Sequence, residues 1–154
     1  MGIPRVLHSA IAARISEATY LLLPHDLGVL SPDAADLVLS QVKDYDALLI
    51  GPGLTAEKEV VSFVEKLFTL QPAAVKAQIG FIKSQVEKTA HTELPPLIVD
   101  ADGLNVLAHE EKWWESLPSN SILTPHPGEM ARLLDCPVSD VESDRLKVAQ
   151  AAAR

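Results

Sequence analysis

The sequence predicts an α/β protein with a mostly parallel sheet flanked by helices. Short apolar runs alternate along the chain with longer segments whose apolar residues have helical spacing. This alternation indicates parallel strands joined by helical crossovers. Apolar residues make up 47% of the chain and aromatic residues only 5%, which favours an α/β core over an aromatic-rich β-sandwich. No repeat or linker interrupts the pattern, so we expect a single domain over residues 1–154.

The first third of the chain contains two helical patterns and one strand pattern. Leu7, Ile11 and Ile15 recur at four-residue spacing and predict a helix over 6–15. A β-prone run predicts a strand over 19–23, and 25–30 is expected to be a loop. Ser31 is suited to cap a helix whose first residue would be Pro32.

The middle third begins with an apolar run over 46–50 that is stopped by a glycine. Strands that are buried on both faces of a parallel sheet have this composition. A turn follows, and Thr55 is suited to cap a helix over 56–70 with one apolar face. A second helix is expected beyond Pro72.

The last third repeats the alternation of strands and helices. Strands are predicted over 97–99 and 121–123, and helices over 104–109 and 129–134. A final helix, capped by Ser139 or Ser143, is expected to run to the end of the sequence.

The charge and composition of the chain disfavour several classes of partner. Thirteen Lys and Arg residues against 21 Asp and Glu residues give a net charge of −8, which disfavours a nucleic-acid partner but permits a nucleotide ligand. The single cysteine, Cys136, excludes an intrachain disulfide. No apolar run reaches the roughly 20 residues of a membrane span, and the start lacks a signal-peptide pattern. We therefore expect no membrane partner and a cytoplasmic location.

Three segments with polar or glycine residues each follow a predicted strand. In open α/β sheets, ligands bind in the crevice beyond the carboxyl ends of the strands. The first segment is Gly51-Pro52-Gly53-Leu54, in which Gly51 and Gly53 would let the backbone approach a ligand closely. A tight strand-to-helix turn without any ligand is the alternative.

The second segment, residues 100–105, carries Asp100, Asp102 and Asn105. Two carboxylates two residues apart at a strand end are expected to point to the same side. They would bind Mg²⁺ through water or orient a polar substrate. Alternatively, Asp102 is only the N-cap of the next helix and Asn105 is solvated.

The third segment, residues 124–129, is the most informative of the three. Two prolines stiffen the backbone around His126, the second being Pro127, and Gly128 permits a sharp turn into a helix led by Glu129. A rigid loop that presents an imidazole at a strand end suits hydrogen bonding to a ligand or general acid–base chemistry. A histidine bonded to a local carbonyl group is the alternative.

Taken in order, the three segments resemble those of the NAD(P)H-hydrate dehydratase family, whose fold is ribokinase-like. The strings that carry the resemblance are Gly51-Pro52-Gly53-Leu54, residues 99–105 and Leu123-Thr124-Pro125-His126-Pro127-Gly128-Glu129. The resemblance covers nearly the whole chain, from about Pro4 onward.

The resemblance implies an ADP-dependent hydro-lyase that repairs hydrated NADH and NADPH, with ADP or ATP as co-substrate and Mg²⁺ as cofactor. It implies that Gly53 and His126 help to bind the hydrated dinucleotide, and that Glu129 lies where related kinases keep a metal-associated glutamate. The substrate-binding set that we expect is completed by Gly51, Asp100, Asp102, Asn105, Pro127, Gly128 and Glu129 itself. Because family members often assemble, a homo-oligomer is compatible with the resemblance.

The chain departs from the family pattern at both ends. The family's opening strand unit would precede Met1, and its nucleotide loop with the catalytic aspartate would follow Arg154. We therefore expect a partial domain, assign no catalytic residue within it and predict that the isolated chain is inactive. Two alternatives stay open: a ribokinase-like kinase of a small vitamin precursor, and a nucleotide-binding fragment without catalysis.

Overall fold

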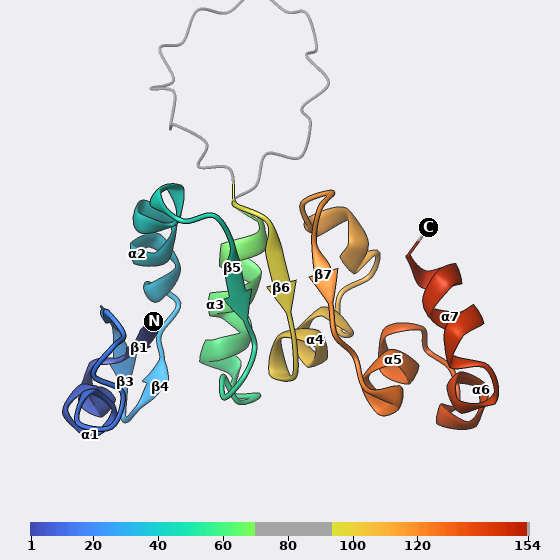
Figure 1. Cartoon of the computed structure of the whole chain (residues 1–154), viewed down its shortest axis with the longest axis horizontal. Helices are drawn as coiled ribbons and strands as arrows, with labels where there is room; N and C mark the ends of the chain where they lie inside the picture. The colour runs from blue at the N-terminus through green and yellow to red at the C-terminus, as the bar shows by residue number, and fades with distance from the viewer. Residues whose placement is uncertain (70–93, 154) are drawn as a thin grey trace, which may run out of the picture.

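The computed structural model describes residues 1–69 and 94–153 (Figure 1). The helix predicted beyond Pro72 and the end of the helix predicted over 56–70 lie outside these residues. The described strands are β1 (Gly2–Pro4), β2 (Leu21–Leu23), β3 (His25–Asp26), β4 (Val29–Leu30), β5 (Leu48–Ile50), β6 (Leu97–Val99) and β7 (Ile122–Leu123). The α-helices are α1 (His8–Ala12), α2 (Ala34–Gln41), α3 (Lys58–Thr69), α4 (Asp102–Leu107), α5 (Pro127–Leu133), α6 (Val138–Ser143) and α7 (Arg145–Ala152).

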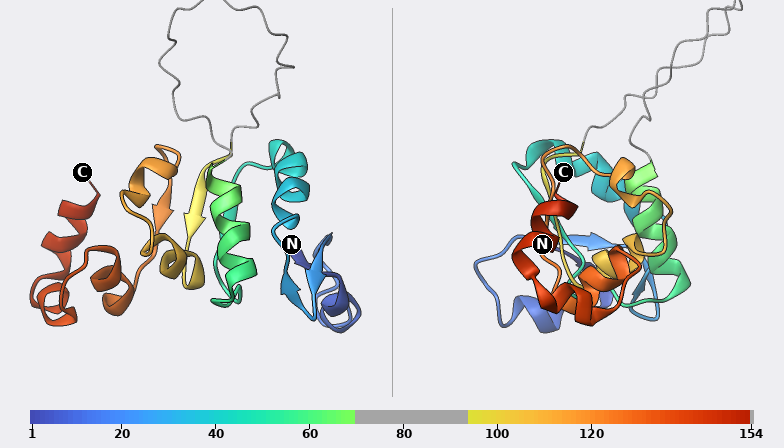
Figure 2. Two further views of the ribbon diagram at one scale, coloured as in Figure 1. Left: turned by 180° about the vertical axis from the view of Figure 1, so that it is seen from behind. Right: turned by 90° about the vertical axis from the view of Figure 1, so that its right-hand side faces the viewer.

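The predicted parallel sheet is confirmed in β5, β6 and β7, which lie side by side in that order. Helices α3 and α4 cover one face of this sheet (Figure 2), and a continuous apolar core fills the space between them. Leu67, Leu97 and Leu104 are fully buried there, and the burial of each such side chain contributes roughly 1.5–3 kcal/mol. The mixed α/β class predicted from the sequence is therefore correct.

The prediction that the strand over 46–50 is buried on both faces is wrong, and the open face continues over β7. Leu49 of β5 is 59% exposed and Ile122 of β7 is 57% exposed. Both are in register with Ile98 of β6, which is half-buried. The residues that alternate with them face the helices, so the apolar composition of the strands does not by itself reveal that one face is open.

The N-terminal region differs from its prediction in two ways. Residues 2–4 form strand β1, which pairs in parallel with β2, and the helical segment shortens to a 3₁₀ turn (Arg5–Leu7) followed by α1. The predicted loop over 25–30 is an antiparallel hairpin of β3 and β4, whose turn residues Leu27 and Gly28 have φ of 46° and 94°. Positive φ at both central positions is the turn geometry that matches the twist of a two-residue hairpin.

Several helix boundaries also differ from their predictions. Ser31 and Pro32 form a turn before α2, which begins only at Ala34. Thr55 does not cap α3, because its φ of 72° is left-handed and the helix begins at Lys58. The last helical pattern is divided into α6 and α7 at Asp144. The side chain of Asp144 accepts a hydrogen bond from the backbone N–H of Lys147 and so caps α7. It takes the capping role that was predicted for Ser139 or Ser143.

Candidate functional site

The three predicted segments meet at the carboxyl edge of the parallel sheet, because β5, β6 and β7 are adjacent and point the same way. Backbone hydrogen bonds join them just beyond the strands. The N–H of Asp100 donates to the carbonyl of Ile50 at 3.1 Å, and the N–H of Thr124 donates to the carbonyl of Val99 at 3.2 Å. The strand-end loops, residues 51–55, 100–105 and 124–129, are thus neighbours in space, as the sequence predicts.

The two glycines of the first loop have different roles. Gly51 is buried with φ of 131°, and a Cβ atom at this position would lie 1.7 Å from the carbonyl oxygen of Asp100. Gly53 has φ of 76°, and a Cβ atom there would meet nothing within 4 Å. Gly51 is therefore required by close packing of two loops, while the open space at Gly53 leaves its backbone accessible to a ligand.

The second loop is locked to the first by a side chain. Oδ2 of Asp102 accepts a hydrogen bond from the backbone N–H of Thr55 at 2.8 Å. Asp102 is not an N-cap, because it lies inside α4 and the cap position is Ala101, with φ of 48° and ψ of −120°. Since β6 ends at Val99, the strand alternation that predicted both carboxylates on the same side does not extend to Asp102.

The sequence does not reveal that the backbone N–H of Thr55 joins the first two loops, because its partner is a residue 47 positions away. Gly103 was missed for a similar reason. A Cβ atom at Gly103 would lie 2.9 Å from a methyl group of Val99 and 3.1 Å from the carbonyl oxygen of Ile50, so this glycine permits α4 to approach β5. The only sequence signal for such a packing role is the glycine at the start of a helical pattern.

Asn105 is held by a side chain of α5, the helix that continues from the third segment. Its Oδ1 accepts a hydrogen bond from the guanidinium of Arg132 in α5 at 2.7 Å, so the alternative of a merely solvated Asn105 is wrong. Arg132 is the cation that joins α4 to α5 beside the strand-end loops.

We expect Arg132→Met, which keeps the apolar stem but removes the donor, to shift the side-chain amide resonances of Asn105. The pair is exposed, so the free energy of unfolding should fall by no more than about 1 kcal/mol. Urea unfolding together with amide NMR checks both results. A fall of more than roughly 2 kcal/mol would contradict this account of an exposed pair.

The third loop forms a reciprocal cap at the start of α5. The N–H of Gly128 donates to Nδ1 of His126 at 3.1 Å, and the backbone N–H of His126 donates to Oε2 of Glu129 at 2.9 Å. Pro127 is the first helical residue, where the lack of an N–H is tolerated. The helix therefore begins two residues before the predicted Glu129.

Glu129 is the residue of the site for which the sequence predicts contact with a metal ion. Both oxygens of Glu129 face His126, at 2.9 Å from its backbone nitrogen and 3.1 Å from Nε2, and the side chain is only 8% exposed. In residues 1–69 and 94–153, no three or more His, Cys, Asp or Glu side chains gather in a way that can hold a metal ion. Both oxygens of Glu129 are thus directed at His126, and the Mg²⁺ role of Glu129 stays a prediction.

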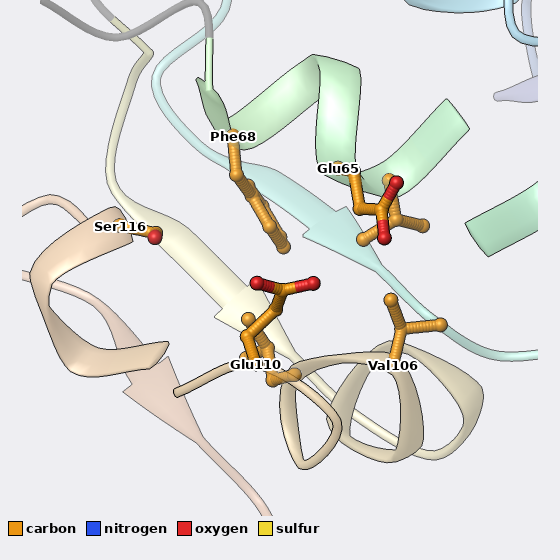
Figure 3. A pocket seen from close by; sticks show the side chains of 7 residues that line it. Glu65, Phe68, Val106, Glu110 and Ser116 are labelled. Carbon is orange, nitrogen blue, oxygen red and sulfur yellow. The ribbon is translucent and has the colours of Figure 1, made fainter. Parts of the chain in front are cut away.

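A cavity lies elsewhere on the molecule, apart from the predicted site residues. It has a volume of about 180 Å³ and lies between α3, α4 and the 3₁₀ turn Trp113–Ser116 (Figure 3). Its lining residues are Val64, Glu65, Phe68, Val106, Leu107, Glu110 and Ser116. None of the predicted site residues lines it, and it is smaller than the roughly 300 Å³ of common ligand pockets.

A model of the family described as NAD(P)H-hydrate dehydratase matches residues 1–154. The chain belongs to this family. The match agrees with the ordered strings at the strand ends and favours the dehydratase family over the kinase alternative. None of the helices within the described residues has the length and apolar character needed to cross a membrane.

Relatives in the NAD(P)H-hydrate dehydratase family are considerably longer than this chain. The bifunctional NAD(P)H-hydrate repair enzyme Nnr of Moorella thermoacetica is 33% identical over 154 residues, covering 99% of this chain and 25% of that protein. Its Escherichia coli namesake is 30% identical over 151 residues, covering 97% and 23%. The bifunctional repair enzyme of Leishmania major is 49% identical over 93 residues, covering 53% and 15%. The chain thus spans a quarter or less of the length of these relatives.

Proposed function

We propose that the chain is part of an ADP-dependent NAD(P)H-hydrate dehydratase, a hydro-lyase that returns (S)-NAD(P)H hydrate to NAD(P)H. The observation that carries this proposal is the convergence of the three family strings at one edge of a parallel sheet. The longer relatives from Moorella thermoacetica and Escherichia coli are named NAD(P)H-hydrate repair enzymes, which supports the same substrate. ADP or ATP as co-substrate, a homo-oligomer and a cytoplasmic location are parts of the proposal.

The described residues are suited to bind and orient a dinucleotide. The accessible backbone at Gly53 permits close approach of a phosphate or ribose. The half-buried Asp100 and Asn105 and the exposed ring of His126 lie on the neighbouring loops. Asp102 contributes by holding two of these loops together rather than by presenting a free carboxylate. We assign no catalytic residue and propose Mg²⁺ only as a companion of the nucleotide.

We expect the chain to bind NADPH, the product of the proposed reaction, and His126→Ala to weaken binding roughly 10-fold, as loss of one polar or stacking contact does. Isothermal titration calorimetry measures the affinity. His109→Ala, which removes an exposed histidine just beyond α4, is the matched control and should bind as the wild type does. Equal affinities of all three proteins, or no binding by the wild type, would argue against the proposed site.

A further inference from the structure

The imidazole of His126 is held at both of its nitrogens by residues of its own loop. Nδ1 accepts the hydrogen bond from the N–H of Gly128, and Nε2 lies 3.1 Å from Oε1 of Glu129. The side chain of His126 is 61% exposed, while that of Glu129 is 8% exposed. A buried carboxylate therefore lies behind an exposed ring.

This arrangement selects one tautomer of the imidazole. A ring nitrogen that accepts a hydrogen bond carries no proton, and the neutral ring has a single proton to place. That proton must be on Nε2, where the carboxylate of Glu129 attracts it. Gly128 and Glu129 together fix both the tautomer and the direction of the ring.

We propose that Glu129 is a positioning residue, which holds His126 as the Nε2–H tautomer with its ring presented to a ligand at the strand ends. This inference rests on the proposed function, in which His126 contacts the dinucleotide. One oxygen of Glu129 lies beside Nε2 of His126 and the other accepts the backbone N–H of the same residue, so both oxygens are directed at His126. Since both ring nitrogens face the loop, a ligand meets the face of the ring rather than a free nitrogen.

Nitrogen-15 NMR of the imidazole in the full 154-residue chain tests the proposal without any variant. Protonated and unprotonated ring nitrogens give distinct signals, and we expect Nε2 to be protonated and Nδ1 unprotonated near neutral pH. The Nδ1–H tautomer would overturn the proposal. Addition of Mg²⁺ alone should leave these signals unchanged, and a shift that requires Glu129 would instead make it a metal ligand.

Glu129→Gln keeps the size and shape of the side chain but removes the carboxylate, so it tests whether the carboxylate positions His126. The amide replaces one carboxylate oxygen by an NH2 group, and an NH2 group that faces Nε2 opposes a proton on that nitrogen. We therefore expect a mixture of tautomers and NADPH binding that is weaker by about 2- to 10-fold, the effect of ordering one side chain. Glu142→Gln is the control, because it makes the same change of charge at an exposed glutamate in α6.

The outcomes separate this inference from the proposed function. Unchanged tautomers in Glu129→Gln, or changed tautomers with wild-type affinity, would overturn the positioning role. Failure of the wild type to bind NADPH would contradict the proposed function, whereas the tautomers of the free wild type and of free Glu129→Gln, compared with each other, still decide whether Glu129 holds the ring.

Discussion

Gly51→Ala is expected to lower the free energy of unfolding by about 3 kcal/mol or more, or to prevent folding. The added methyl group would lie 1.7 Å from the carbonyl oxygen of Asp100, which is backbone and cannot move aside alone. The positive φ of 131° adds strain of about 1–3 kcal/mol for a residue with a side chain. Overpacking of the two loops adds a similar amount. Denaturant unfolding followed by circular dichroism measures the loss.

Gly53→Ala is the matched control for Gly51→Ala, since it changes the same residue type two positions later in the same loop. The φ of 76° at Gly53 also disfavours alanine, but the space around this residue is open. We therefore expect a loss of only about 1–2 kcal/mol, which is the cost of the left-handed backbone conformation. Equal losses in the two variants would show that the contact between the first two loops does not constrain Gly51.

Asp102→Ala is expected to lower the free energy of unfolding by about 1 kcal/mol, because its hydrogen bond to Thr55 involves a charged group but is exposed to solvent. It removes the acceptor for the N–H of Thr55 and so releases the first loop from the second. Amide hydrogen exchange should report the release as faster exchange at Thr55.

Asp102→Asn retains an oxygen acceptor of nearly the same shape and is the control for Asp102→Ala. Because only the charge is lost, we expect Asp102→Asn to keep slow exchange at Thr55. It should also retain more than half of the free energy of unfolding that Asp102→Ala loses. Unchanged exchange at Thr55 in Asp102→Ala would contradict the assigned connection between the loops.

The sequence predicts the parallel sheet and the position of the strand-end loops because both depend on local patterns. The apolar runs that become β5, β6 and β7 are short and sharply bounded, and the family strings follow them directly. The pairing of β1 with β2 is not predictable in this way, because residues 2–4 become a strand only through hydrogen bonds to residues about 19 positions later.

The chemistry of the loops could be predicted only in part. The rigid presentation of His126 was predicted from its flanking prolines, but the direction of its ring depends on Glu129 and Gly128 after the helix has begun. Similarly, Asp102 has the sequence environment of a helix cap or metal ligand, yet its carboxylate contacts the backbone of another loop. Contacts between segments distant in the sequence decide which of several roles a polar residue takes.

Amide NMR of the chain during titration with NADPH tests the central claim most directly, because it locates the bound ligand on the fold. We predict that the largest shifts occur together at Gly53, Asn105 and Gly128, one residue from each of the three strand-end loops. Shifts confined to residues that line the cavity between α3 and α4, or no shifts at saturating NADPH, would contradict a dinucleotide site at the carboxyl edge of the sheet.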